Sequence, residues 1–142
     1  MKKKLISALI VLTLFLSQAN AQTTGVPDTL AYLQTIVANK AQYIGQPFSL
    51  LINHLQIEVR RFGPSGNIHH NKDLETSTSF SFYCPTSTND SYKLFPALRV
   101  MWNPYLNNSS SMSLFTLFGG CWASQVYNHY ANAIVRDIDI LD

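Results

Sequence analysis

The sequence predicts an α+β fold in which a small, mostly antiparallel sheet of three to four strands carries helices packed on one face. Two observations lead to this class. Apolar residues recur at helical spacing before and after a central block in which they alternate with polar ones. The alternating runs follow one another through short polar loops with no helical crossover, so we expect neighbouring strands to be antiparallel.

Two helices are expected first. Asp28 and Thr29 cap a segment that Gly45 ends, and Pro47 starts a second, shorter helix. The apolar residues with helical spacing in the first segment are Leu30, Leu33, Ile36, Val37, Ala41 and Ile44. Those of the second are Phe48, Leu51, Ile52 and Leu55.

Three strands should follow. Residues 55–60 alternate and are broken by the Gly/Pro-rich stretch 63–67; residues 76–84 and 94–102 alternate again. We expect the strands that contain Ile57 and Phe82 to pair antiparallel. Their buried face should include Val59, Phe80 and Cys84, and Pro96 should lie at an edge or bulge.

The C-terminal part contains one ambiguous segment. Residues 107–111 form a plausible N-cap cluster, while 112–118 fit both a short helix and a fourth strand. Residues 121–133 then predict a helix, and the alternation in 134–141 predicts a terminal strand.

The N-terminus has the pattern of a secretory signal peptide. Three lysines precede a short apolar run from Leu5 to Leu16, and small residues precede a cut after Ala21. The apolar run is shorter than the roughly 20 residues that a membrane-spanning helix needs. We therefore expect residues 1–21 to be removed, leaving residues 22–142 as a single exported domain, periplasmic or extracellular, with no membrane span.

The charge of the expected mature chain excludes nucleic acid and anionic lipid as partners. Loss of the three lysines leaves seven basic residues against eight acidic ones. Apart from Arg60 and Arg61, residues 22–142 have no basic cluster that would form an electrostatic footprint.

The two cysteines, Cys84 and Cys121, predict one disulfide bond. Exported proteins meet an oxidising compartment, and an even number of cysteines there indicates pairing. A bridge would tie the last expected helix to the second expected strand.

The stretch 119–124, GGCWAS, resembles the Cys-Trp-Ala helix start of papain-type cysteine proteases. In that family the catalytic histidine lies about 130–150 residues after the cysteine. Only 21 residues follow Cys121, and the oxyanion glutamine of the family would fall on Phe115. This departure favours a structural role for Cys121.

A candidate surface site is formed by His69, His70 and Asp73 in the polar loop after the first strand, and Glu75 belongs to the same polar group. Imidazole and carboxylate groups bind metals, but adjacent histidines on extended backbone point apart, and no metal-ligand spacing accompanies them. We expect a solvated loop with no bound metal or cofactor.

The chain also resembles small exported proteins of unassigned role from Bacteroidota. The resemblance lies in the lysine-rich leader, in residues 43–51 (YIGQPFSLL) and in residues 134–138 (IVRDI). It implies a compartment and no chemistry.

The sequence contains no recognisable catalytic grouping and therefore favours a non-enzymatic module that binds an unknown protein or small molecule. The alternative is a small hydrolase that uses Cys121 or the His69/His70 loop.

Overall fold

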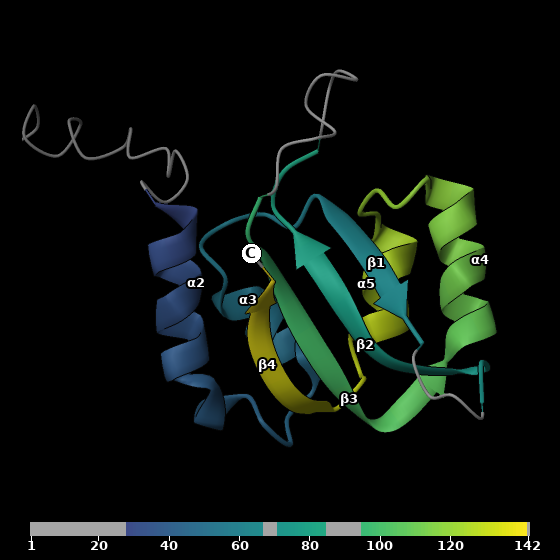
Figure 1. The fold of residues 1–142 in the computed structure, drawn as a ribbon, viewed down its shortest axis with the longest axis horizontal. Coiled ribbons are helices and arrows are strands. Elements are labelled where there is room, and N and C mark those ends of the chain that lie inside the picture. Colours follow the sequence, from purple (N-terminus) through teal and green to yellow (C-terminus); the bar gives the residue numbers. More distant parts are fainter. Residues whose placement is uncertain (1–27, 67–70, 85–94, 142) are drawn as a thin grey trace, which may run out of the picture.

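The computed structural model describes residues 28–66, 71–84 and 95–141, and it confirms the predicted fold class (Figure 1). A four-stranded antiparallel sheet is accompanied by four α-helices in this part of the chain. None of these helices is long and apolar enough to cross a membrane. In chain order the elements are α2 (Thr29–Ala38), η1 (Lys40–Gln42), α3 (Phe48–His54), β1 (Arg61–Ser65), β2 (Leu74–Ser81), β3 (Ala97–Asn107), α4 (Asn108–Phe118), α5 (Ser124–Tyr130) and β4 (Val135–Leu141).

The strands lie in the order β1-β2-β3-β4, and each pairs antiparallel with its neighbour. Figure 1 shows α3 and α5 behind the sheet, with α2 beside β4 and α4 beside β1. Residues directly opposite each other on paired strands share a face. The face that the helices cover is therefore apolar, with the opposed pairs Phe62↔Phe80, Phe80↔Leu98, Leu98↔Ile140 and Val100↔Ile138.

Aromatic rings fill the space between sheet and helices. Phe48 of α3 stacks on Phe80 with ring centroids 4.6 Å apart, and Trp102 of β3 stacks on Tyr130 of α5 at 5.6 Å. All four side chains are almost completely buried. Large rings dominate the energetics of such cores, so this cluster fixes α3 and α5 against the sheet.

The first strand begins later than the sequence predicts. Residues 55–60 form no strand and precede β1, and the predicted break at Gly63 and Pro64 lies inside the strand. Proline is tolerated because β1 is an edge strand. β1 and β2 pair antiparallel, and Val59 and Phe80 are buried as expected. Ile57 and Phe82, however, lie outside these strands, and Cys84 is only partly buried.

The ambiguous segment 112–118 is helical and belongs to α4. The Asn107 side chain caps this helix by accepting a hydrogen bond from the Ser110 backbone N–H at 2.9 Å. Gly119 ends it in the left-handed conformation, with φ of 59°. This cap and stop explain why a short apolar run forms a helix here.

The predicted helix 121–133 is shorter in the structure and begins only at Ser124. The residues before it run along the outer edge of β1. The Phe62 N–H donates to the Gly120 carbonyl at 3.0 Å, and the Trp122 N–H donates to the Arg60 carbonyl at 2.9 Å. These residues pair with the free backbone N–H and C=O groups of the edge strand β1 instead of forming the first turn of the helix that their apolar spacing predicts.

Two adjacent glycines after α4 provide a matched test of this connection. Gly119 and Gly120 both have positive φ, of 59° and 75°. A Cβ on Gly119 would meet nothing within 4 Å, whereas one on Gly120 would lie 2.8 Å from Phe115 Cε2. We expect Gly119→Ala to cost about 1–2 kcal/mol of unfolding free energy from backbone strain. Gly120→Ala should cost about 1–3 kcal/mol more through the clash. Urea denaturation of both variants measures this, and equal losses would contradict the packing described.

Candidate functional site

A fully buried carboxylate, Glu75 of β2, is the most unusual feature of the described residues. The buried polar side chains there are Glu75, Thr78 and Ser111, each with no exposed surface. A regular strand cannot place residues 75 and 78 on one face, because its side chains alternate. The register between β2 and β3 shifts between Glu75 and Ser77, and across this irregularity both side chains face the core.

Four elements supply hydrogen-bond donors to this carboxylate or to its neighbour. The Thr78 and Tyr130 hydroxyls donate to Glu75 Oε1, the latter at 3.0 Å. The Ser111 hydroxyl of α4 donates to Oε2. Trp102 of β3 donates through Nε1 to Thr78 Oγ1 at 2.8 Å, which leaves the Thr78 proton for the carboxylate. An ionised carboxylate only accepts hydrogen bonds, so the arrangement suits the charged form.

Two opposing effects act on the pKa of Glu75. Burial raises it, because the charged form loses its hydration. The hydrogen bonds from Ser111, Thr78 and Tyr130, with Trp102 behind Thr78, act in the opposite direction, since they stabilise the charged form. Burial dominates, so the carboxyl group binds a proton more readily than an exposed glutamate does.

His129 connects this network to the surface. Its Nε2 lies 2.8 Å from Ser111 Oγ, and the ring packs edge-on against Tyr130 with centroids 4.7 Å apart. The side chain is half-buried, and burial lowers its pKa. A continuous path of hydrogen bonds therefore runs from Glu75 through Ser111 to a partly exposed imidazole.

This order of groups differs from that of a hydrolytic triad. In a triad the acid orients the histidine, and the histidine activates an accessible serine. Here the carboxylate contacts the serine itself, and Ser111 has no exposed surface on which a substrate could be attacked. The chemistry that this geometry supports is the holding and relaying of a proton.

The predicted disulfide is wrong, since both Cys84 and Cys121 are free. Cys121 pairs with Arg61 of β1 in an isolated backbone β-bridge, and on its other side Arg61 lies opposite Ser81 of β2. Strand β1 therefore separates the two segments that carry the cysteines. Two interstrand spacings amount to roughly 9–10 Å. Disulfides need Cα atoms within about 7 Å. The error arose because a helix was expected to begin at Cys121 and to cross the sheet.

The predicted histidine loop is only partly described. His69 and His70 lie outside the described residues, and the prediction for them stands as made. Asp73 is exposed, and its backbone N–H donates to Asn71 Oδ1 at 3.0 Å in a local turn. In the described ranges no group of three potential metal ligands occurs.

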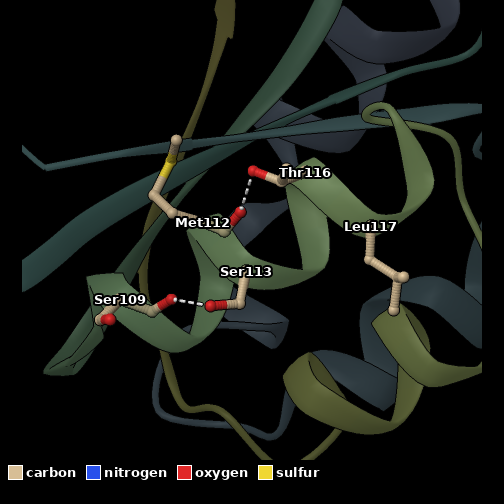
Figure 2. Close-up of a pocket in the computed structure, with 5 residues that line it drawn as sticks. All are labelled: Ser109, Met112, Ser113, Thr116 and Leu117. Carbon is tan, nitrogen blue, oxygen red and sulfur yellow. Dashed lines mark hydrogen bonds between the residues drawn. The ribbon is translucent and has the colours of Figure 1, made fainter.

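A second feature is the outer face of α4, shown in Figure 2. A shallow pocket there is lined by Ser109, Met112, Ser113, Thr116 and Leu117. Leu117 is 72% exposed and Met112 41%, and α4 contains no charged residue. The Ser113 and Thr116 hydroxyls turn back to the carbonyls of Ser109 and Met112, at 2.8 and 2.9 Å. With these hydroxyls engaged, the face is more apolar than its composition suggests.

Comparison with protein-family models, with curated proteins and with solved structures found no match for this chain.

The buried network was not predicted from the sequence. The alternation of residues 76–84 begins after Glu75, so the sequence groups this acid with the polar residues of the loop and not with the core. Ser111 belongs to the expected helix cap of residues 107–111, and His129 lies within the helix expected over residues 121–133. Tyr130 lies in the same expected helix, but no spacing in the sequence relates it to Glu75.

The raised pKa of Glu75 predicts a pH-dependent difference between the wild type and Glu75→Gln. A carboxyl group with a raised folded pKa contributes stability that is complete below its unfolded pKa, about 4.5, and that is lost as the pH rises through the folded value. The glutamine variant lacks this titration. We therefore expect its unfolding free energy, relative to wild type, to rise between pH 4.5 and pH 8. Each unit of pKa difference corresponds to about 1.4 kcal/mol.

Urea denaturation at several pH values measures this difference. Glu58→Gln is a suitable control, because Glu58 is exposed and forms a surface ion pair with Arg60 at 2.8 Å. A pH-independent difference between wild type and Glu75→Gln would contradict a raised pKa at this site.

Proposed function

We propose that the chain is an exported, non-enzymatic interaction module that binds through the outer face of α4, and that its partner there is a second copy of the chain. Export is supported by the signal-peptide pattern of residues 1–21. The observation that carries the binding proposal is the outward stripe of α4. Its members, residues 109, 112, 113, 116 and 117, have the spacing i, i+3, i+4, i+7 and i+8.

Such spacing forms one continuous helix face, the kind that packs against another helix. Most surface helices carry charges on this face, but α4 has none. Its opposite face is already used, since Ser111, Leu114, Phe115 and Phe118 turn towards the rest of the domain. A second helix is therefore the partner whose shape and polarity fit the outward stripe.

The stripe is also suited to pairing with itself. It has a small residue, Ser109, near its start and a large one, Leu117, near its end. If two copies meet antiparallel about a two-fold axis at Ser113, each Leu117 lies over Ser109 of the other copy. A two-fold contact is self-complementary by symmetry, and an uncharged face brings no like charges together.

The contact should be weak. α4 has 11 residues, so it is about 16 Å long. One short helix pair buries less than the roughly 1,200 Å² of a stable interface. We therefore expect a dimer that forms and dissociates with concentration.

Sedimentation equilibrium of the purified exported protein tests the proposal. The average mass of the wild type should rise from monomer towards dimer with concentration. Leu117→Lys should weaken association at least tenfold, because two ammonium groups would be desolvated at the contact. Leu30→Lys, at the exposed Leu30 of α2, is the matched control and should associate as the wild type does.

A cysteine at the predicted axis gives a second test. In a Cys84→Ser, Cys121→Ser background, Ser113→Cys should form a disulfide-linked dimer on mild oxidation. Ser124→Cys, exposed at the start of α5, should not. A wild type that stays monomeric at high concentration, or a Leu117→Lys variant that associates normally, would overturn the assignment of a second copy to this face.

A further inference from the structure

We infer that Ser111 is a hydroxyl relay through which the charge of the buried Glu75 determines which ring nitrogen of the half-exposed His129 carries a proton. The relay spans three elements: Glu75 belongs to β2, Ser111 to α4 and His129 to α5. It is a pH-sensitive device built into the junction of these elements.

The inference follows from the single proton of the Ser111 hydroxyl. Oγ contacts Glu75 Oε2 and lies 2.8 Å from His129 Nε2. An ionised carboxylate has no proton to donate, so Ser111 must donate to it. The hydroxyl can then only accept from His129, which requires a proton on Nε2.

Protonation of Glu75 reverses this direction. The carboxyl group can then donate to Ser111 Oγ, and the freed hydroxyl proton can point to His129 Nε2. That nitrogen must now be the acceptor, so the neutral ring carries its proton on Nδ1. The Nε2 proton leaves to solvent and Nδ1 takes one from solvent, and the net uptake is the one proton on Glu75.

One other acceptor competes for the Ser111 proton. The Asn107 carbonyl lies 3.3 Å from Oγ, at the preceding turn of α4. His129 Nε2 is nearer by half an ångström, and hydrogen bonds weaken as they lengthen. The imidazole is therefore the favoured acceptor once Glu75 is neutral.

No other described charge is positioned to override the relay. β2 presents Thr78 to the carboxylate, β3 presents Trp102 to Thr78, and α5 presents Tyr130 to the carboxylate. The phenol stays protonated, because burial and Glu75 both raise its pKa. The described ion pairs involve other residues: Lys40–Asp137, Arg60–Glu58 and Arg99–Asp139. Asp73, two residues from Glu75, is exposed in its turn.

The two ionisable ends of the relay should titrate as a coupled pair. An ionised Glu75 favours a proton on His129 Nε2, and a neutral Glu75 disfavours it. A change of pH therefore alters the hydrogen bonds between β2, α4 and α5 together. The relay operates whether or not α4 binds a second copy.

Glu75→Gln imitates the protonated carboxyl group, since its amide Nε2 can donate to Ser111 while Oε1 accepts from Thr78 and Tyr130. Long-range ¹H–¹⁵N correlation spectra of His129 distinguish the two neutral tautomers. At pH 8 we expect the Nε2–H form in the wild type and the Nδ1–H form in Glu75→Gln. The same tautomer in both proteins, or an Nδ1–H form in the wild type, would overturn the relay.

The Ser111→Ala variant distinguishes the relay from a purely structural role of Glu75, because it removes the hydroxyl that connects Glu75 to His129. In this background the Glu75→Gln substitution should leave the His129 tautomer unchanged. In the otherwise wild-type chain, Ser111→Ala should lower the pKa of His129 further, because the charged ring loses its connection to the carboxylate. This second measurement remains decisive if Glu75→Gln does not fold, and an unchanged His129 pKa would contradict the inference.

Discussion

A carboxylate removed from water has to be surrounded by hydrogen-bond donors, and this requirement at Glu75 organises the junction of sheet and helices. Its donors come from β2, α4 and α5, with Trp102 of β3 behind Thr78. Removing one partner of a buried charge leaves the others unpaired, which is more costly than the pair itself is stabilising. The apolar core holds the elements together, while the network specifies how α4 and α5 sit.

The network also connects the two features to which a role is assigned, the outer face of α4 and the half-exposed His129 of α5. Ser111 turns inward from α4 to Glu75, whereas Ser109, Met112 and Leu117 of the same helix face outward. A helix held by one buried serine and three apolar residues can present an uncharged stripe without losing its position. His129 reaches the surface from the neighbouring helix α5. A change in the protonation of Glu75 therefore alters the hydrogen bonds of a side chain that lies beside α4, the helix of the proposed contact.

Local patterns in the sequence were sufficient for the fold class, since caps, stops and hydrophobic periodicity act within a few residues. Asp28 caps α2 as expected, and the alternation in 134–141 forms β4, but α2 ends at Ala38, well before the expected stop at Gly45. The failures concern non-local pairing. The backbone contact between Gly120 and the edge of β1 delays the start of the expected helix and keeps Cys121 away from Cys84. The register shift near Glu75 directs the side chain of this predicted loop residue into the core. Period-two patterns cannot reveal where a ladder slips.

A double-mutant cycle between Glu75→Ala and Ser111→Ala, measured by urea denaturation at pH 7, tests the central role of the carboxylate most directly. Each single substitution leaves a buried polar partner without its hydrogen bond, but the second substitution removes that partner as well. The two losses of unfolding free energy should therefore sum to more than the loss in the double variant, by about 1 kcal/mol or more. Additive losses would show that Glu75 and Ser111 contribute independently, and would contradict the account of the network.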